Sequence, residues 1–394
     1  MNRLQINSQA KFHLRHGYRW VFSNELREHP RLERGSPVEL IDQEHQFIAW
    51  GYYNPDALIA VRVMDIRPIS TTLDNWLYQK LDHCRELREY WYPSCRSLRF
   101  CYSESDGLPG LIIDRYEDYF VIQLNTAGIR QFQQPIIDYL LEKFNPSGII
   151  LRSDHHSLDL EQITETPGLI WGKLPSPDIV WIEENGIRFA IPLVDGQKTG
   201  FFYDQRENRN LLRRFIKKND SVLDVFSYTG AWGLYAAHCG AHEITFIDRT
   251  LMIADLIRLQ MQENGFHQIW NYINEDAFES LKSLKKQHKL FDCIILDPPA
   301  FIKSRKKVKE GLEGYYHLNL LGMQLLKPGG ILVSCSCSYH LREDKLIEIV
   351  QQTAHQNHRT PHLLHKGLQA YDHPISLFHS ETQYLKSIFF QLGD

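Results

Sequence analysis

Two cysteines stand one residue apart near the C-terminus, in the stretch GGILVSCSCSYH. Cys335 and Cys337 end an apolar run, at the point where a strand would give way to a loop. Thiols in this position can pack in a core, bind a metal, form a redox pair or act as a nucleophile. Two cysteines at this spacing lack two further metal ligands nearby, and a disulfide across so short a loop would be strained. Core packing and nucleophilic catalysis are the interpretations that remain.

The two thiols are expected to differ in their surroundings. Side chains alternate along a strand, so Cys335 and Cys337 share a face for as long as the strand persists. Free cysteine is among the most buried residue types, which favours core packing for Cys335. Cys337 lies nearer to the loop. A catalytic role there requires a thiolate, formed by a lowered pKa or by removal of the proton as the substrate binds.

Four acidic residues follow apolar stretches in the second half of the chain. Asp224 ends SVLD, Asp248 ends EITFID, Asp276 follows NYINE, and Asp297 ends FDCIILD. Ligands of open α/β sheets bind at the carboxyl ends of the strands, so these four carboxylates mark the edge where chemistry is expected.

The spacing of the acids favours a particular class of cofactor. Asp248 lies 24 residues beyond Asp224, near the distance of about 20 residues at which an acid grips a ribose diol. A helix N-cap is the alternative for Asp248. Asp276 could meet an adenine amino group. The loop FSYTGAWG carries Gly230 and Gly233 but no glycine triplet for a pyrophosphate, so the pattern fits S-adenosylmethionine better than NAD. A plain tight turn explains Gly230 about as well.

The fourth acid belongs to the stretch LDPPAF. Two prolines after Asp297 fix a rigid, extended turn. A stiff acidic turn at the ligand-binding edge of such a sheet is more often functional than structural, and the sequence therefore favours a role for Asp297 and Pro298 in the site.

Three segments position these residues. Residues 1–70 show short strands and turns. Residues 72–182 combine helical spacing in LDNWLYQKLDHCRELREYWY with strand-like pieces such as GLIIDRY and YFVIQLN. Residues 183–394 alternate strand and helix, which predicts a mostly parallel, doubly wound sheet. The chain is therefore predicted to be an α/β protein with a small β module and an α+β middle domain before the sheet.

Composition limits the possible functions. The chain has 394 residues, 43% of them hydrophobic, and seven scattered cysteines without disulfide or zinc spacing. Neither a signal peptide nor a membrane-spanning run is visible, so a cytoplasmic protein without a metal is expected. The net charge of −4 argues against general binding of polyanions but leaves room for local basic patches.

The densest positive run, KSRKKVKEG, directly follows LDPPAF. A solvated loop is the commonest fate of such a run. Its placement modestly favours a clamp for RNA phosphates at the mouth of the site. The clamp would consist of Lys303, Arg305, Lys306, Lys307 and Lys309.

Eight stretches together resemble one known family. They are HGYRWVFSNEL, ESDGLPGLIIDRY, DGQKTGFFYDQRENR, FSYTG, LDPPAF, SCS, DHP and YLK. In this order they resemble the bacterial large-subunit ribosomal RNA methyltransferases that make 5-methylcytosine from S-adenosylmethionine. The resemblance covers essentially the whole chain and implies a PUA domain, which is an RNA-binding β barrel, and a Rossmann-like class I methyltransferase domain. This chain departs from the family pattern at Ala300, where a basic residue is common, and in the extra Cys335.

The resemblance also implies roles at matching positions. Cys337 would be the nucleophile and Asp297 a second catalytic group facing the target base with Pro298. Asp248 would bind the ribose, with Arg249 beside it, and Asp276 and Ala277 would meet the adenine. His373 of DHP would support the floor of the site. The methionine part would lie among Asp224, Phe226, Thr229 and Gly230, and a hairpin and helix edge beside cofactor and base would hold Lys198, Thr199, Phe202, Asp204, Gln205 and Arg209.

Three functions are compatible with these residues. The first is methylation of cytosine carbon five in large-subunit ribosomal RNA, with S-adenosylhomocysteine as the second product and a homodimer as a possible assembly. The second is methylation of another RNA position, such as guanine N7, which needs no nucleophile. The third is a non-catalytic RNA-binding factor for ribosome assembly. Cys337 argues against the second function, and the intact acids at four strand ends argue against the third.

Overall fold

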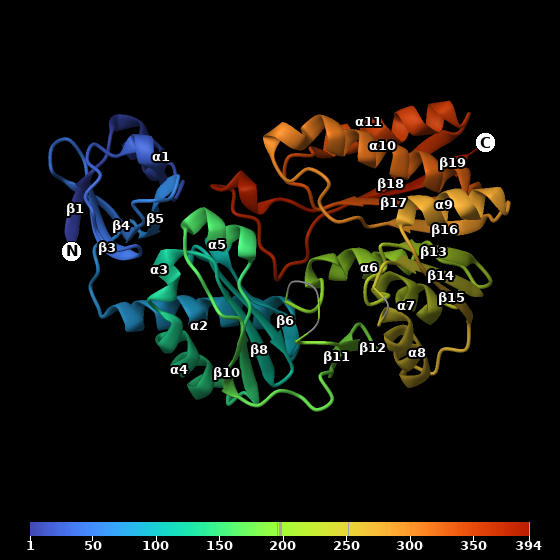
Figure 1. Ribbon diagram of the computed structural model, residues 1–394, viewed down its shortest axis with the longest axis horizontal. Helices are drawn as coiled ribbons and strands as arrows, with labels where there is room; N and C mark the ends of the chain where they lie inside the picture. Colours follow the sequence, from blue (N-terminus) through green and yellow to red (C-terminus); the bar gives the residue numbers. More distant parts are fainter. Residues whose placement is uncertain (195, 197–198, 251, 394) are drawn as a thin grey trace. The chain divides into compact units, whose positions relative to one another are not determined.

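The computed structural model describes residues 1–194, 196, 199–250 and 252–393, which form two compact units (Figure 1). Each unit is assembled from separate parts of the chain. The first consists of Met1–Val180, Ile191–Tyr203 and Tyr371–Thr382, and the second of Trp181–Ala190, Asp204–Ala370 and Gln383–Asp394.

The first unit begins with a five-stranded sheet that holds helix α1 (Ser8–Arg15). Strands β1 and β3 are parallel, and the other pairs are antiparallel. Alternating buried residues such as Val38, Leu40 and Val61 build its core. In spatial order the strands are β1 (Asn2–Gln5), β3 (Ser36–Ile41), β4 (Phe47–Tyr53), β5 (Ile59–Asp65) and β2 (Trp20–Phe22).

A second five-stranded sheet completes the first unit, together with helices α2 (Leu73–Trp91), α3 (Ala127–Arg130), α4 (Gln133–Phe144) and α5 (His155–Glu161). The Thr72 side chain caps α2 by accepting a hydrogen bond from the Asn75 backbone N–H. The strands in order are β10 (Gly168–Gly172), β9 (Gly148–Leu151), β8 (Tyr119–Leu124), β7 (Leu111–Tyr116) and β6 (Ser97–Tyr102).

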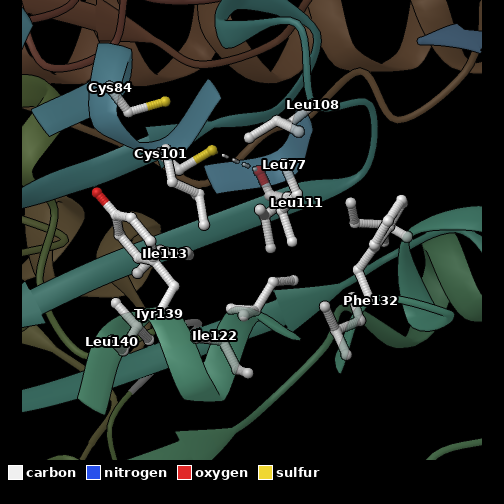
Figure 2. Close-up of a cluster of buried hydrophobic side chains, with 14 of the residues drawn as sticks. Leu77, Cys84, Cys101, Leu108, Leu111, Ile113, Ile122, Phe132, Tyr139 and Leu140 are labelled. Carbon is white, nitrogen blue, oxygen red and sulfur yellow. Dashed lines mark hydrogen bonds between the residues drawn. The ribbon is translucent and has the colours of Figure 1, made fainter. Parts of the chain in front are cut away.

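The core of this second sheet is shown in Figure 2, where apolar side chains from α2, α4 and the strands meet. Cys84 of α2 and Cys101 of β6 lie in it, and the Cys101 thiol donates to the Leu111 carbonyl at 3.7 Å. Both cysteines are fully buried, so they behave as small apolar residues of the core.

An ion pair in the first unit ties α2 to the turn after β6. Arg88 donates to both carboxylate oxygens of Asp106 at 2.7 Å, and both side chains are 2% exposed. Arg88 also donates to the backbone carbonyl of Asp372, at 2.8 Å. Since Asp372 follows the last helix of the chain, this cluster anchors a late segment of the sequence in the first unit.

The second unit contains a seven-stranded sheet. Its strands in order are β15 (Ile269–Asn274), β14 (Glu243–Asp248), β13 (Ser221–Val225), β16 (Phe291–Leu296), β17 (Leu326–Ser336), β19 (Lys386–Gly393) and β18 (Thr360–Gly367). The first five are parallel, while β19 runs antiparallel to both β17 and β18. The predicted α/β class and the mostly parallel sheet are confirmed.

Helices cover both faces of this sheet (Figure 1). One face carries α9 (Ala277–Lys286), α10 (Val308–Gln324) and α11 (Glu343–Gln356), which share one apolar core with β13, β16 and β17. The other carries α7 (Ala231–His238) and α8 (Ile253–Glu263). Strands covered on both sides read as continuous apolar runs, which is why the CIILD and ILVSC stretches could be assigned from sequence.

Two shorter elements precede the sheet. A hairpin is formed by β11 (Val180–Glu184) and β12 (Ile187–Ile191), and helix α6 (Arg206–Leu212) follows it. Among the residues described, no helix is both long and apolar enough to cross a membrane.

Replacing Asp106 by Ala tests the buried ion pair of the first unit. We expect the free energy of unfolding to fall by about 3–5 kcal/mol, because the substitution leaves a buried guanidinium without its counter-charge. Urea denaturation measures the effect. Glu89→Ala is the control, since Glu89 forms an exposed pair with Arg85 and should cost at most about 1 kcal/mol. An Asp106→Ala effect no larger than the control would contradict this account.

Candidate active site

The loop after β13 has an unusual backbone at the carboxyl edge of the sheet. Phe226 and Tyr228 both have positive φ, at 64° and 44°, and Gly230 has φ of 77°. Non-glycine residues in this region cost about 1–3 kcal/mol each, and such strain collects at functional sites. The loop is held by the Asp248 carboxylate, which accepts a hydrogen bond from the Tyr228 backbone N–H at 2.9 Å. Asp248, at the end of β14, thus helps to fix the conformation of the loop that follows β13.

Glycine at position 230 is also required by packing. A Cβ there would lie 3.0 Å from Ile257 and 3.2 Å from Phe246. The neighbouring Thr229 is buried, and its carbonyl accepts a hydrogen bond from Gln260 at 2.8 Å. Gly230 therefore does more than close a tight turn, because it lets α7 begin directly against α8 and β14.

Asp224 is a fully buried carboxylate beneath this loop. Its Oδ2 accepts a hydrogen bond from the Gly233 backbone N–H at 3.0 Å. Its Oδ1 has no hydrogen-bond partner within the described part of the chain. Burial, reinforced by the nearby charges of Asp297 and Asp248, raises the pKa of Asp224 to about 8. A buried oxygen without a partner is suited to a cationic ligand, and S-adenosylmethionine carries an ammonium and a sulfonium group.

Asp248 and Asp276 act differently at the next two strand ends. The Asp248 Oδ1 accepts a hydrogen bond from the Thr250 N–H at 3.1 Å. It is not a helix N-cap, because α8 begins only at Ile253. The N-cap is Asp276, which accepts hydrogen bonds from the first turn of α9 at 3.0 and 3.2 Å and forms an ion pair with Arg249. The buried Ala277 opens α9.

The Asp297 carboxylate accepts hydrogen bonds from two side chains of other elements. The Gln205 amide donates to both of its carboxylate oxygens at 3.2 Å, and the Trp232 indole N–H donates to Oδ2 at 3.0 Å. Burial raises the pKa of Asp297 to about 6, although the hydrogen bond from Trp232 opposes this shift. Asp297 can therefore carry a proton near neutral pH or release it.

Cys335, in β17, and Cys337, just beyond the end of that strand, have different environments, as the sequence predicted. Cys335 is 1% exposed, and its sulfur lies 3.1 Å from the Ser387 hydroxyl. Burial raises the pKa of the Cys335 thiol well above its ordinary value. Cys337 is partly exposed, and its sulfur lies 3.8 Å from the Pro298 carbonyl oxygen. The structure therefore places Cys337 against the LDPPAF turn.

A hydroxyl network holds the backbone on both sides of Cys337. The Ser336 hydroxyl donates to Tyr315 at 2.8 Å, and Tyr315 shares a hydrogen bond of 2.9 Å with the Ser338 hydroxyl. Ser338 also accepts a hydrogen bond from the Ile302 N–H at 3.1 Å. The two serines that flank Cys337 thus join the end of β17 to α10 and to the LDPPAF turn, which fixes the position of the thiol.

Helix α6 carries predicted site residues with buried partners. Arg209 donates to both carboxylate oxygens of Glu184 at 2.9 Å, and Arg206 donates to the same carboxylate at 3.1 Å. The structure therefore places the Arg209 guanidinium on Glu184 of β11. Asp204 is buried, and its Oδ2 accepts a hydrogen bond of 2.6 Å from the Tyr384 hydroxyl.

Other predicted residues lie elsewhere. Lys198 is outside the described residues. Thr199 and Phe202 belong to the first unit, as does His373, whose Nδ1 lies 2.7 Å from Asp372. The members of the predicted phosphate clamp are all exposed and occupy the stretch between the LDPPAF turn and the first turn of α10; they are Lys303, Arg305, Lys306, Lys307 and Lys309.

Sequence reasoning overlooked four side chains of this region: Glu184, Trp232, Tyr384 and Lys386. Trp232 could have been suspected, since it opens the helix that follows the first strand. The buried Glu184 shows no signal in the sequence beyond being one of two adjacent acids in the stretch VWIEE. Lys386 lies in the YLK stretch, and its ammonium group donates to the carbonyls of Ser338 and Tyr384 at 2.7 and 2.8 Å.

One group of side chains in the described structure could be mistaken for a metal site. Cys84, Cys101 and Asp106 bring their ligand atoms within 4.8 Å of one another. However, both carboxylate oxygens of Asp106 are already bonded to Arg88. The guanidinium supplies the charge that a cation would bring, so the cluster is explained by the ion pair.

Comparison with known proteins defines the class of the molecule. Residues 4–65 match the model of a PUA-like domain, and residues 170–367 match that of an S-adenosylmethionine-dependent methyltransferase. Among solved structures, a methyltransferase in complex with S-adenosylhomocysteine has a TM-score of 0.85 at 21% identity, with coverage of 99% of this chain and 100% of that one. An S-adenosylmethionine-dependent methyltransferase from Streptococcus mutans has a TM-score of 0.83 at 21% identity and the same coverage. The chain is thus a methyltransferase of the S-adenosylmethionine-dependent class with a PUA-like domain.

Curated relatives narrow the class to one family. Ribosomal RNA large subunit methyltransferase I of Shewanella denitrificans is 34% identical over 391 residues, which are 98% of each chain. The enzyme of the same name from Aliivibrio fischeri is 34% identical over 377 residues, or 95% of each chain. The chain belongs to the ribosomal RNA large subunit methyltransferase I family, which confirms the resemblance seen in the sequence at the level of the family.

Replacing Asp224 by Asn tests the buried carboxylate. We expect the dissociation constant of S-adenosylhomocysteine, measured by calorimetry, to rise about 10-fold or more, because a hydrogen bond between charged groups contributes about 1.5–3 kcal/mol. Asp220→Asn, at the opposite end of β13, is the matched control. Unchanged binding by Asp224→Asn would contradict the assignment of Asp224 to the cofactor.

The same substitution should change the pH dependence of stability. Because the pKa of Asp224 is raised to about 8 in the fold, the native state holds a proton that the unfolded chain releases at lower pH. The free energy of unfolding should therefore fall as pH rises from the ordinary carboxyl range to about 8. Asp224→Asn should flatten this slope in urea denaturation of the cofactor-free protein, and an unaltered slope would refute the raised pKa.

Proposed function

We propose that this protein methylates carbon five of a cytosine in large-subunit ribosomal RNA through a covalent bond between Cys337 and the base. The observation that carries the proposal is the placement of the Cys337 sulfur 3.8 Å from the carbonyl oxygen of Pro298, the residue that follows Asp297 in the chain. A nucleophile and an acid–base group thus lie at the carboxyl edge of the sheet, where ligands of such folds bind.

Cytosine chemistry explains the need for a thiolate. Carbon five is a poor nucleophile until a group adds to carbon six. When the Cys337 thiolate forms a bond to carbon six, the electrons of the ring double bond shift so that carbon five becomes enamine-like. Carbon five would then form a bond to the electrophilic methyl group that S-adenosylmethionine supplies, while the bond from that methyl group to the sulfonium sulfur breaks and leaves a thioether. Release of the proton on carbon five then restores the double bond and expels the Cys337 thiolate.

Asp297 is suited to assist this addition. As sulfur attacks, negative charge spreads from the ring carbons to the ring nitrogen. With a pKa raised to about 6, Asp297 can donate a proton or a hydrogen bond to that nitrogen near neutral pH. The hydrogen bonds from Gln205 and Trp232 fix the direction of the carboxyl group. Preorganised polar groups of this kind are an important source of rate enhancement.

The RNA partner is supported by two features and by the relatives. The PUA-like domain has no evident use in a methyltransferase for small molecules. The exposed cations from Lys303 to Lys309 directly follow the LDPPAF turn, where they can contact phosphates without reading sequence. The curated relatives bear names that specify large-subunit ribosomal RNA. A target base would have to leave its stack to reach the half-buried Cys337 thiol.

Methyl transfer from labelled S-adenosylmethionine to unmodified large-subunit ribosomal RNA tests the proposal. We expect wild type and Cys335→Ala to yield labelled 5-methylcytosine on nucleoside analysis. Cys337→Ala should lose at least about 1,000-fold of the rate, because the covalent route is then closed. Cys335→Ala is the matched control, because it removes a thiol two residues away, near the end of β17. A methylated guanine, or activity that survives Cys337→Ala, would overturn the proposal, and retained cofactor binding without transfer by wild type would point to an assembly factor.

A further inference from the structure

We propose that Lys386 is a positioning residue whose buried ammonium group stabilises Cys337 as the thiolate. The inference rests on the proposed role of Cys337 as the nucleophile and adds a group that activates it. It concerns the second unit alone, in which both residues lie.

The sheet places the lysine beside the cysteine. In the antiparallel pair β17–β19, Ser336 is opposite Lys386 and Cys335 is opposite Ser387. Cys337 is therefore one residue beyond the partner of Lys386. The ammonium group donates to the carbonyl of Ser338, the residue after Cys337, at 2.7 Å. Strand pairing and this hydrogen bond thus hold the charged group along the backbone that carries the thiol.

The ammonium group has few other means of stabilisation. Lys386 is only 7% exposed, and lysines are rarely buried without a paired charge. Its two bonded partners are neutral carbonyls, of Ser338 and Tyr384, so one of its three N–H donors is left over. Within the described residues no carboxylate forms an ion pair with it. The carboxylate of Glu343, whose charge raises the pKa of Lys386, forms its own ion pair with Lys366 at 2.6 Å.

Electrostatics agrees with this geometry. Burial lowers the pKa of Lys386 to about 8, while attraction to Cys337, and secondarily to Glu343, raises it in opposition. The negative charge of a thiolate at Cys337 would thus offset part of the free-energy cost of burying the Lys386 ammonium group. At pH 7 the amine keeps its proton, so a thiolate at Cys337 would have a buried positive charge close to it. Above about pH 8 the amine loses its charge and the thiolate loses this stabilisation.

The pair would solve a problem of the proposed chemistry. An ordinary cysteine is only a few per cent thiolate at neutral pH. A fixed positive charge raises the thiolate fraction before the base arrives, and it keeps the sulfur near the LDPPAF turn. The Tyr384 hydroxyl bonded to Asp204 secures the other end of this arrangement.

The test measures the alkylation rate of Cys337 by iodoacetamide as a function of pH, read by mass spectrometry of the peptide that contains it. Lys386→Met removes the charge at similar volume, Lys386→Gln keeps an N–H donor without the charge, and Lys386→Arg keeps the charge. We expect Met and Gln to shift the midpoint upward by about 1 pH unit and to slow alkylation at pH 7 about 10-fold. Arg should retain most of the reactivity.

Controls separate this role from a structural one. Lys282→Met removes an exposed lysine of α9 that pairs with Glu279, and it should leave the profile unchanged. Thermal unfolding and S-adenosylhomocysteine binding establish that each variant is folded. If Lys386→Met does not fold, the alkylation profile of Lys386→Gln tests the inference instead. An unshifted midpoint in the folded neutral variants would overturn the inference. Because alkylation needs no RNA, this failure is distinct from failure of the proposed function, which Cys337→Ala would reveal in methyl transfer.

Discussion

Parallel pairing of β16 with β17 is the constraint on which the proposed chemistry depends. Leu296 pairs with Ser334, so both strands end at the same edge of the sheet. The LDPPAF turn and the cysteine segment must therefore emerge side by side, although 39 positions separate Pro298 from Cys337. A register shift by one residue would turn the thiol to the opposite face. The apolar residues of both strands fix that register because they are buried on both faces.

Burial of polar groups defines the rest of the site and opposes stability. Asp224 and Asp297 have raised pKa values because they lie in a region with little solvent, and Lys386 has a lowered pKa for the same reason. The loop from Phe226 to Gly230 adds backbone strain. The free energy that these buried charges and this strain cost is offset by well-packed surroundings, such as the apolar core shared by α9, α10 and α11. Their concentration at one edge is what a site for a charged cofactor and a reactive base requires.

The sequence predicted those features that depend on local pattern. Buried strands read as apolar runs, and Asp224, Asp248 and Asp297 could be placed at strand ends because each closes such a run. Asp276 could be placed from the alternation of strand and helix, although its strand β15 is largely exposed. The contrast between Cys335 and Cys337 followed from burial along a strand. The partners of these residues come from remote parts of the chain, and pattern does not encode them. Trp232 and Gln205 reach Asp297 only through tertiary packing, and Lys386 reaches the Cys337 segment only through the antiparallel return of β19.

Trapping the covalent bond tests the central claim most directly. Large-subunit ribosomal RNA that contains 5-fluorocytidine cannot lose a proton from carbon five, so a thiolate bound to carbon six remains attached after methyl transfer. Mass spectrometry of the digested adduct identifies the residue involved. The account predicts an adduct on the peptide that contains Cys337, formed by wild type and Cys335→Ala but not by Cys337→Ala. The absence of an adduct with active wild-type protein, or an adduct on another residue, would contradict it.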